Sequence, residues 1–278
     1  PSSDLFFYQT DLGRSSLRLI LRSLKLKGRI FIPDFLCPTV TDVLDQEKVC
    51  YAFYHIRPDL TIALSSLTGV RRGDAVYVID YFGRRDNILD HWPFGKETLV
   101  IEDAVFSPWI EKPKWLARWI GFNSFRKILP VADGSFIFST LKLNGQYLQP
   151  GEAPYVSIKY QAKAKKYGYV RHGLLSEFVY LNQFAQADRM IKRQKNIYET
   201  SAESLRRICD FFQNSREEQA LRQKNYQLLQ SKLSRYAVLR SCPSFASFFV
   251  MATPRRDALR EFLFQKKVFL PEDIRSLP

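Results

Sequence analysis

Six short apolar segments between residues 29 and 140 restrict the fold more than any other feature of this chain. Each has an apolar centre of about five residues, rich in β-branched or aromatic side chains, as buried β-strands do. They occupy residues 29–35, 48–56, 74–83, 98–105, 119–125 and 135–140. Because the segments between them are mostly long enough to hold a helix, the pattern predicts an α/β architecture with a largely parallel sheet.

Helical patterning precedes these strands and dominates after them. Residues 13–25 place their apolar side chains on one helical face, so we expect a helix there. From about residue 176 to residue 233 the apolar residues again have helical spacing. A turn is predicted to interrupt this second stretch at Asn214–Ser215.

The last part of the chain predicts a smaller folding unit. After Pro243 the expected order is strand, helix and strand, at residues 244–254, 255–267 and 268–271. We therefore expect two domains. One is a large α/β domain over residues 1–190, and the other combines connecting helices with a smaller α+β domain over residues 191–278.

The chain carries 42 Lys and Arg against 28 Asp and Glu, a formal net charge of +14. Such a charge favours an anionic partner, whether nucleic acid, an acidic membrane surface or a phosphorylated small molecule, and does not choose among them. No apolar run approaches the roughly 20 residues that span a bilayer. No signal-peptide pattern opens the sequence. We therefore expect a cytoplasmic protein without a membrane partner.

Cysteine and histidine are too sparse for the usual metal sites. The four cysteines, at positions 37, 50, 209 and 242, form no CxxC pair, a pattern typical of a reducing compartment. None of the three histidines is near another in the sequence. We therefore expect no metal site.

Three segments of the first half carry side chains suited to chemistry. Residues 13–16 (Gly-Arg-Ser-Ser) open a predicted helix, where free N–H groups favour an anion, unless the serines simply cap the helix. Glu102 and Asp103 end an apolar strand, where open α/β sheets bind ligands, unless they form a solvated loop pair. Lys127, beside Arg126 and among aromatic residues, is either a nucleophile of depressed pKa or a surface lysine.

In order and spacing, these segments resemble the DegT/DnrJ/StrS-type sugar aminotransferases, which are pyridoxal-phosphate (PLP) enzymes of fold type I. GRSSL at 13–17 resembles the Gly-Thr-x-Ala-Leu motif that binds the cofactor phosphate. LVIEDAVFSP at 99–108 resembles the Val-Ile-Glu-Asp-Ala-Ala-Gln segment. Residues 119–139 resemble the Ser-Phe…Lys…Gly-Gly segment that bears the cofactor lysine. The resemblance covers most of residues 10–140.

The resemblance implies a PLP-transferase fold with a mostly parallel sheet, a smaller C-terminal α+β domain, PLP as the cofactor and a homodimer. It implies that Lys127 forms the internal aldimine and moves protons, and that Asp103 pairs with the protonated pyridine nitrogen. Phe35 would stack on the ring. The phosphate would be held by Gly13, Arg14, Ser15, Ser16 and Ser124.

The implied activity is amino transfer to a keto-sugar, expected to be nucleotide-linked, from an amino acid donor. The chain departs from the family at Phe106, where Gln is usual, at Asp80, where His or Asn is usual, and in the short Ser-Phe-Arg-Lys spacing. The alternative is therefore a catalytically degenerate scaffold that binds a ligand or a protein.

Residues 159–172 interleave Lys and Arg with Tyr, which suits a phosphate- or base-stacking surface or a solvated loop with its Tyr rings packed inward. The overall charge also leaves a nucleic-acid-binding protein as a third hypothesis, although we expect no such partner.

Overall fold

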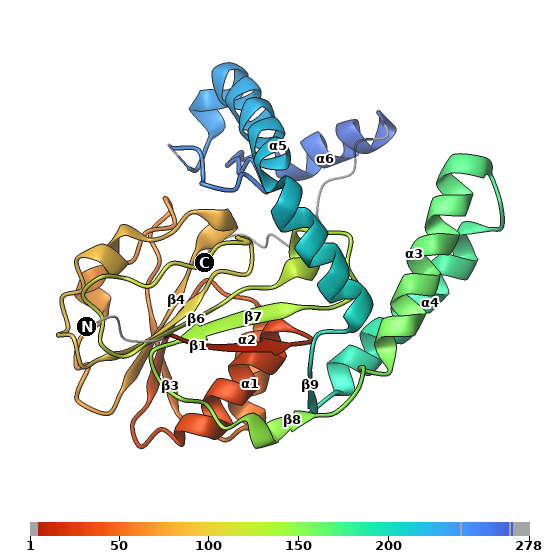
Figure 1. Ribbon diagram of the computed structural model, residues 1–278. Helices are drawn as coiled ribbons and strands as arrows, with labels where there is room; N and C mark the ends of the chain where they lie inside the picture. The colour runs from red at the N-terminus through yellow and green to blue at the C-terminus, as the bar shows by residue number, and fades with distance from the viewer. Residues whose placement is uncertain (1–4, 240, 267, 269–278) are drawn as a thin grey trace.

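The computed structural model describes residues 5–239, 241–266 and 268 of the 278-residue chain. Its centre is a seven-stranded sheet in the order β1-β7-β6-β5-β4-β2-β3 (Figure 1). Strands β2 to β6 pair in parallel, whereas β7 is antiparallel to both of its neighbours, β1 and β6. The strands are β1 (Phe6–Thr10), β2 (Ile30–Pro33), β3 (Tyr51–Tyr54), β4 (Ala75–Ile79), β5 (Leu99–Asp103), β6 (Trp119–Phe122) and β7 (Ser135–Ser139).

The six strands expected from the sequence are present as β2 to β7, so the predicted α/β class with a mostly parallel sheet is confirmed. Strand β1 was not expected. It is an edge strand, defined by its pairing with β7, and its Phe7 ring lies against Phe136 and Phe138 of that neighbour. Such an edge is specified by its partner more than by its own residue pattern.

The first helix of the chain confirms the helix expected at residues 13–25. A short parallel pair, β8 (Leu148–Gln149) and β9 (Ile197–Tyr198), joins two segments that are distant in sequence. The helices are α1 (Gly13–Leu24), α2 (Pro38–Gln46), α3 (Tyr155–His172), α4 (Glu177–Arg193), α5 (Ala202–Leu233) and α6 (Arg256–Gln265).

The two faces of the sheet are covered differently. On one face, apolar residues of α1 and α2 pack against side chains of β2, β4, β5 and β6. On the other face, Ile62, Leu67, Leu89 and Leu116 come from irregular connections and pack on residues such as Val76 and Trp119. These connections contain Pro and Gly and form only turns and short 3₁₀ helices, although their length would allow helices.

The turn predicted at Asn214–Ser215 is wrong, because α5 continues through both residues. The Asn214 side chain donates to the carbonyl of Asp210 (3.1 Å), and Ser215 Oγ donates to the carbonyl of Phe212 (3.2 Å). Both polar side chains therefore bond to the preceding helical turn rather than end the helix. The next residues, Arg-Glu-Glu-Gln-Ala, are strong helix formers.

The strand predicted at residues 244–254 is also wrong, since this segment forms only an isolated bridge between Ala237 and Met251. Its aromatic residues pack in several directions rather than on alternate faces: Phe245 contacts Trp109 and Phe211, and Phe248 contacts Phe106. The helix expected at 255–267 is present as α6. The strand expected at 268–271 lies largely outside the described residues, and the domain division at residue 190 stays a prediction.

Candidate active site

The carboxyl ends of β1, β4, β5 and β6 all lie at the same end of the strands, which we call the carboxyl edge of the sheet. This holds for β1 because β1 and β6 are both antiparallel to β7. Strand β5 ends at Asp103, and β1 leads into α1 at Gly13. Strand β6 leads into Ser124 and the 3₁₀ helix η4 (Phe125–Lys127). A Cβ built on Gly13 would lie 3.6 Å from Cβ of Ser124 and 3.5 Å from Cγ1 of Val105. The three segments singled out in the sequence therefore meet here.

Asp103 is buried at this edge and is held by two donors. The hydroxyl of Tyr77 donates to Oδ2, and the backbone N–H of Val105 donates to Oδ1 (3.2 Å). Loss of hydration on burial raises the pKa of Asp103 to about 6, although both hydrogen bonds and the charge of Lys127 act to lower it. Each carboxylate oxygen has more than one lone pair, so Asp103 can still accept a charged N–H donor.

Lys127 is exposed to solvent as a residue, yet its amine is partly shielded from water and has charged and aromatic neighbours. Nζ lies 5.8 Å from the centre of the Phe106 ring. Partial loss of hydration, followed by repulsion from Arg126, lowers the pKa of the amine, whereas Asp103 acts in the opposite direction. The amine is therefore both accessible and easier to deprotonate than an ordinary lysine.

The N-terminus of α1 has open backbone donors at the same edge. Leu12 precedes the helix and makes no side-chain capping bond, and the first bond into the helix is donated by Ser16 to the carbonyl of Leu12 (2.9 Å). The N–H groups of Gly13, Arg14 and Ser15 therefore have no partner within the helix. Together with the helix dipole they favour an anion. Ser124 lies next to this terminus and caps no helix with its side chain.

Two residues assigned to the phosphate from sequence are already engaged. Ser16 Oγ lies 2.8 Å from Thr10 Oγ1 and 2.7 Å from Ser135 Oγ, and Ser135 in turn donates to the carbonyl of Asn123. Ser16 therefore supports the turn rather than offering a free donor. Arg14 donates to the carbonyl of Ile191 (3.2 Å) and to Thr39 Oγ1 (3.4 Å), so it ties α1 to α4 and α2. Ser15 is fully buried.

Phe35 is also engaged. Its ring stacks on Tyr81 at a centroid distance of 5.5 Å, and its carbonyl accepts a bond from the Tyr81 hydroxyl. Cys37, two residues further along, is exposed and interacts electrostatically with Lys127.

Cationic side chains surround the site, with Arg126 at their centre. Arg126 interacts electrostatically with Arg14, Lys127, Lys159 and Lys163. Lys159 has an anionic partner, because Nζ lies 2.9 Å from Oδ1 of Asp188. Within the part of the chain that the structure describes, Arg126 makes no hydrogen bond or ion pair. This arrangement supplies an unneutralised positive charge next to the reactive amine.

Two residues that matter here were given no role in the site by the sequence analysis. Tyr77 donates to Asp103 from β4, and it faces the same side of the sheet because its register partner Ile101 precedes Asp103 by two residues. That relation was readable only once the register of β4 and β5 was known. Arg126 was noted as a neighbour of Lys127, but its place among residues of α3 depends on the tertiary fold.

Two buried acidic residues, Glu102 and Asp80, form a pair on the opposite face of the sheet from Asp103. Glu102 accepts from Nε1 of Trp119 (2.6 Å) and Nε of Arg85 (3.2 Å). Burial, followed by repulsion from Glu102, raises the pKa of Asp80 well above its usual value. Two carboxyl groups in one buried place hold a proton more readily than either group alone.

Asp80→Asn is expected to stabilise the protein, because a buried ionised carboxyl at this position costs free energy. A raised folded-state pKa means that stability is greatest at low pH and falls as pH rises from about 4 towards the folded-state value. The gain of Asp80→Asn should therefore be near zero at pH 4 and about 1–2 kcal/mol at pH 8, about 2–4 °C in Tm. Thermal unfolding at the two pH values measures it.

Asp74→Asn is the matched control for this experiment. Its buried carboxylate accepts backbone N–H groups of Arg29 (3.0 Å) and Arg71 (2.8 Å), so this change should give no such gain. A lower Tm for Asp80→Asn at pH 8 would contradict the account of a protonated acidic pair.

Within residues 5–239, 241–266 and 268, no group of three or more His, Cys, Asp or Glu side chains is arranged to hold a metal ion. In the same residues, no helix has the length and apolar content to cross a bilayer.

No protein-family model and no curated protein matches this sequence. Solved structures do match. A DegT/DnrJ/EryC1/StrS aminotransferase from Brucella abortus is 14% identical, with 97% of this chain aligned to 73% of that chain at a TM-score of 0.59. DesV from S. venezuelae, solved with a ketimine intermediate, is 13% identical over 94% of this chain and 68% of that chain, at 0.58. AtS13 from Actinomadura melliaura is 14% identical over 95% and 71%, at 0.55.

The chain is shorter than these proteins, and it spans 41% of the sugar aminotransferase CalS13 from Micromonospora echinospora. At such low identity the matches establish the fold. The chain has the α/β fold of the PLP-dependent sugar aminotransferases, as its resemblance to them predicted.

Proposed function

We propose that this protein is a PLP-dependent aminotransferase that acts on an anionic keto-sugar, expected to be nucleotide-linked, with an amino acid as the nitrogen donor. One observation supports this above the others. A buried acid, Asp103, and an accessible amine of lowered pKa, Lys127, interact at the carboxyl edge of the sheet, beside the open N-terminus of α1.

The residues at this edge fit the chemical groups of PLP. PLP supplies an electron sink that lets an amino acid lose its α-proton. Asp103 would hold the protonated ring nitrogen, for which an ionised carboxylate is the complementary partner. Tyr77 favours that ionised form because its hydroxyl donates to the carboxylate.

Lys127 would carry the covalent bond to the cofactor aldehyde and afterwards move the proton. Both tasks require an amine that loses its proton near neutral pH, and the surroundings of Nζ lower its pKa in that direction. The phosphate would lie against the open N–H groups of residues 13–15 and the hydroxyl of Ser124. Ser16 would act behind them, by holding the turn through Thr10 and Ser135.

The cationic surroundings support an anionic substrate. Arg126 is unpaired among the described residues and faces Lys127 together with Lys159 and Lys163 of α3. A phosphate-bearing sugar would neutralise this charge, whereas an uncharged sugar would leave it uncompensated. We therefore propose that the sugar is nucleotide-linked. We further propose, from the resemblance alone, that the enzyme is a cytoplasmic homodimer.

The proposal is tested by loading the purified protein with PLP, reducing it with borohydride and mapping the peptides by mass spectrometry. We expect one pyridoxyl group, on Lys127. An amino acid donor should then convert bound PLP to pyridoxamine phosphate. Absence of both the adduct and the conversion, in a protein with an intact fold, would favour the alternative of a degenerate binding scaffold.

Arg126→Ala is expected to raise KM for the sugar by about 10–100-fold with little change in kcat, because it removes charge-assisted contacts to a non-reacting anionic group. Steady-state kinetics with a nucleotide-linked keto-sugar measures both constants. Arg72→Ala is the control, since Arg72 is exposed in the turn before β4, at the opposite edge of the sheet. An unchanged KM in Arg126→Ala would remove Arg126 from the substrate site.

A further inference from the structure

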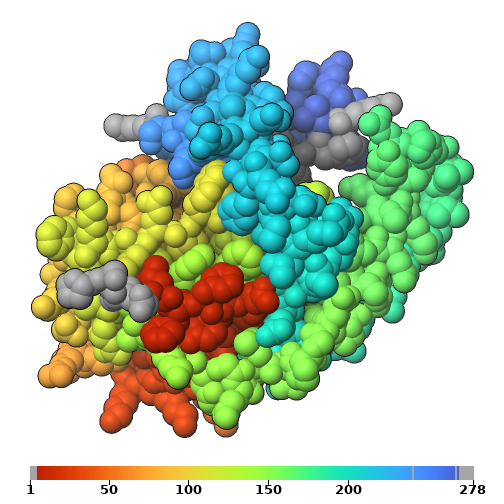
Figure 2. Space-filling view, viewed as in Figure 1, coloured from red at the N-terminus to blue at the C-terminus, as the bar shows by residue number. Residues whose placement is uncertain are grey.

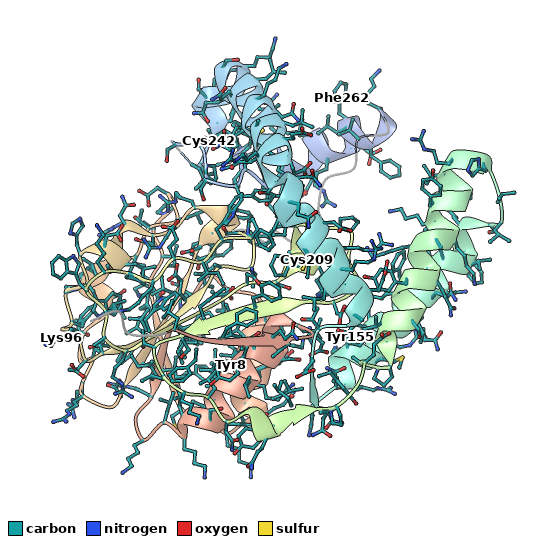
Figure 3. The ribbon with its side chains drawn as sticks, viewed as in Figure 1. Tyr8, Lys96, Tyr155, Cys209, Cys242 and Phe262 are labelled. Carbon is teal, nitrogen blue, oxygen red and sulfur yellow. The ribbon has the colours of Figure 1, made fainter. Side chains whose placement is uncertain are left out.

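Helices α3 and α4 form a hairpin that stands away from the sheet (Figures 1 and 2). Its base is attached to the body of the protein. The hydroxyl of Tyr155, labelled in Figure 3, donates to Oδ2 of Asp11 (3.1 Å), and Arg14 donates to the carbonyl of Ile191. Lys159 and Asp188 join the two helices by an ion pair. The hairpin is therefore an ordered projection.

The outer part of this projection, residues 163–181, is here called the hairpin tip. It has a concentration of exposed apolar side chains that is unusual for a surface facing water. Each of the following is between 50% and 68% exposed: Tyr167, Val170, Leu174, Leu175, Phe178 and Leu181. None of them belongs to a buried cluster of the described residues.

The turn holds two leucines outward at the end of the hairpin. Gly173 ends α3 in a left-handed conformation, with its N–H bonded to the carbonyl of Tyr169 (3.0 Å). Ser176 caps α4 by accepting from the N–H of Phe178 (3.3 Å). Leu175 between them has φ of 65°, a conformation that a leucine rarely adopts. An ordered turn that presents leucines to solvent in this way indicates an apolar partner.

The charges of the hairpin tip limit what that partner can be. The tip contains one acidic residue, Glu177, and four basic residues, of which Lys163 lies near Arg126 of the active site and Lys165, Lys166 and Arg171 follow it toward the turn. None of the four basic residues forms an ion pair among the described residues. Apolar side chains at a convex end, ringed by unneutralised cations, complement a surface that is both apolar and anionic.

We propose that the hairpin tip docks on an anionic lipid bilayer, with Leu174 and Leu175 in the interface and the cations near the headgroups. Two such tips from two copies of the chain would instead bring like charges together. We expected no membrane partner from the sequence because no segment is long enough to span a bilayer. Peripheral docking needs only this cluster of side chains, which the helical turn assembles.

Co-sedimentation with vesicles tests the proposal on the full chain. We expect binding to vesicles of phosphatidylglycerol and phosphatidylcholine, weak binding to phosphatidylcholine alone, and loss of binding as salt is raised. The double change Leu174→Ser/Leu175→Ser should remove most of the binding. The double change Lys165→Glu/Lys166→Glu should weaken partitioning by about tenfold or more.

Matched controls lie on α5, where Leu228 and Leu229 are also exposed. Leu228→Ser/Leu229→Ser and Lys224→Glu/Lys232→Glu should bind like the wild-type protein. Phe178→Trp gives an independent readout, because its emission should shift to shorter wavelength with vesicles and be quenched by brominated lipid. Vesicle binding that tip changes leave intact, or no binding at all, overturns the proposal. Tip changes that instead split a dimer, measured by light scattering, would assign the tip to a second copy.

Discussion

Lys127→Ala should abolish covalent attachment of PLP and lower kcat/KM by about four orders of magnitude or more. General acid–base catalysis alone contributes about 10²–10⁴-fold, and this change removes the covalent step as well. The amine is exposed and makes no hydrogen bond within the described residues, so its removal should leave folding intact. Borohydride trapping with peptide mapping, together with single-turnover kinetics, measures both effects.

Lys127→Arg tests whether activity needs an amine that can lose its proton or only a positive charge at this position. Arginine keeps the positive charge next to Asp103, yet it does not lose its proton at neutral pH, so this variant should be as inactive as Lys127→Ala. Lys48→Ala, an exposed lysine at the opposite edge of the sheet, serves as the control. A pyridoxyl group on another lysine, or retained turnover in either Lys127 variant, would show that the nucleophile has been assigned wrongly.

Asp103→Asn should lower kcat by about 10²–10³-fold, the usual cost of removing a group that stabilises charge in the transition state. The protein itself should become more stable above pH 6, not less. Burial raises the pKa of Asp103 to about 6, so the ionised group costs free energy in the folded state at neutral pH, and the neutral amide avoids that cost. Activity and stability should therefore change in opposite directions.

The pH dependence of cofactor binding gives a second readout of Asp103. Affinity for pyridoxamine phosphate should fall as pH drops from 7 to 5, because protonation near pH 6 removes the carboxylate charge. Calorimetry with the wild-type protein and Asp103→Asn separates this effect from titration of the ligand. An equal pH dependence in the two proteins would exclude Asp103 as the partner of the ring nitrogen.

The residue pattern predicted the sheet well because its central strands β2, β4, β5 and β6 are buried along their whole length and are therefore mostly apolar. Segments 74–83 and 98–105 became β4 and β5 in this way, and their ends placed Asp103 at the binding edge. Lys127 was singled out because its segment resembles the one that bears the cofactor lysine, although its spacing from Ser124 is shorter than usual. The association of these residues with α1 follows from the order of the strands, which a single sequence does not encode locally.

Other features depended on contacts that no local pattern reports. The hydroxyl of Ser16 is occupied by Thr10 and Ser135, although the motif suggested a phosphate ligand. Phe35 stacks on Tyr81, which is distant in sequence. Similarly, alternating aromatic residues after Pro243 predicted a strand, but Phe245 and Phe248 fill space against the segment that follows β5. Tertiary packing decided each of these outcomes.

Helix α5 is a brace about 48 Å long, by the rise of 1.5 Å per residue over its 32 residues. Its first end is fixed where Ser201 bonds to Asp133, and further along Arg222 lies 4.7 Å from the ring of Phe245, in the segment before α6. Because α5 is held at two places along its length, it cannot move without moving the residues that it contacts there. Any tilt of α5 therefore displaces Phe245, which lies in the same segment as Phe248, and Phe248 lies against Phe106, whose ring centre is 5.8 Å from the reactive amine.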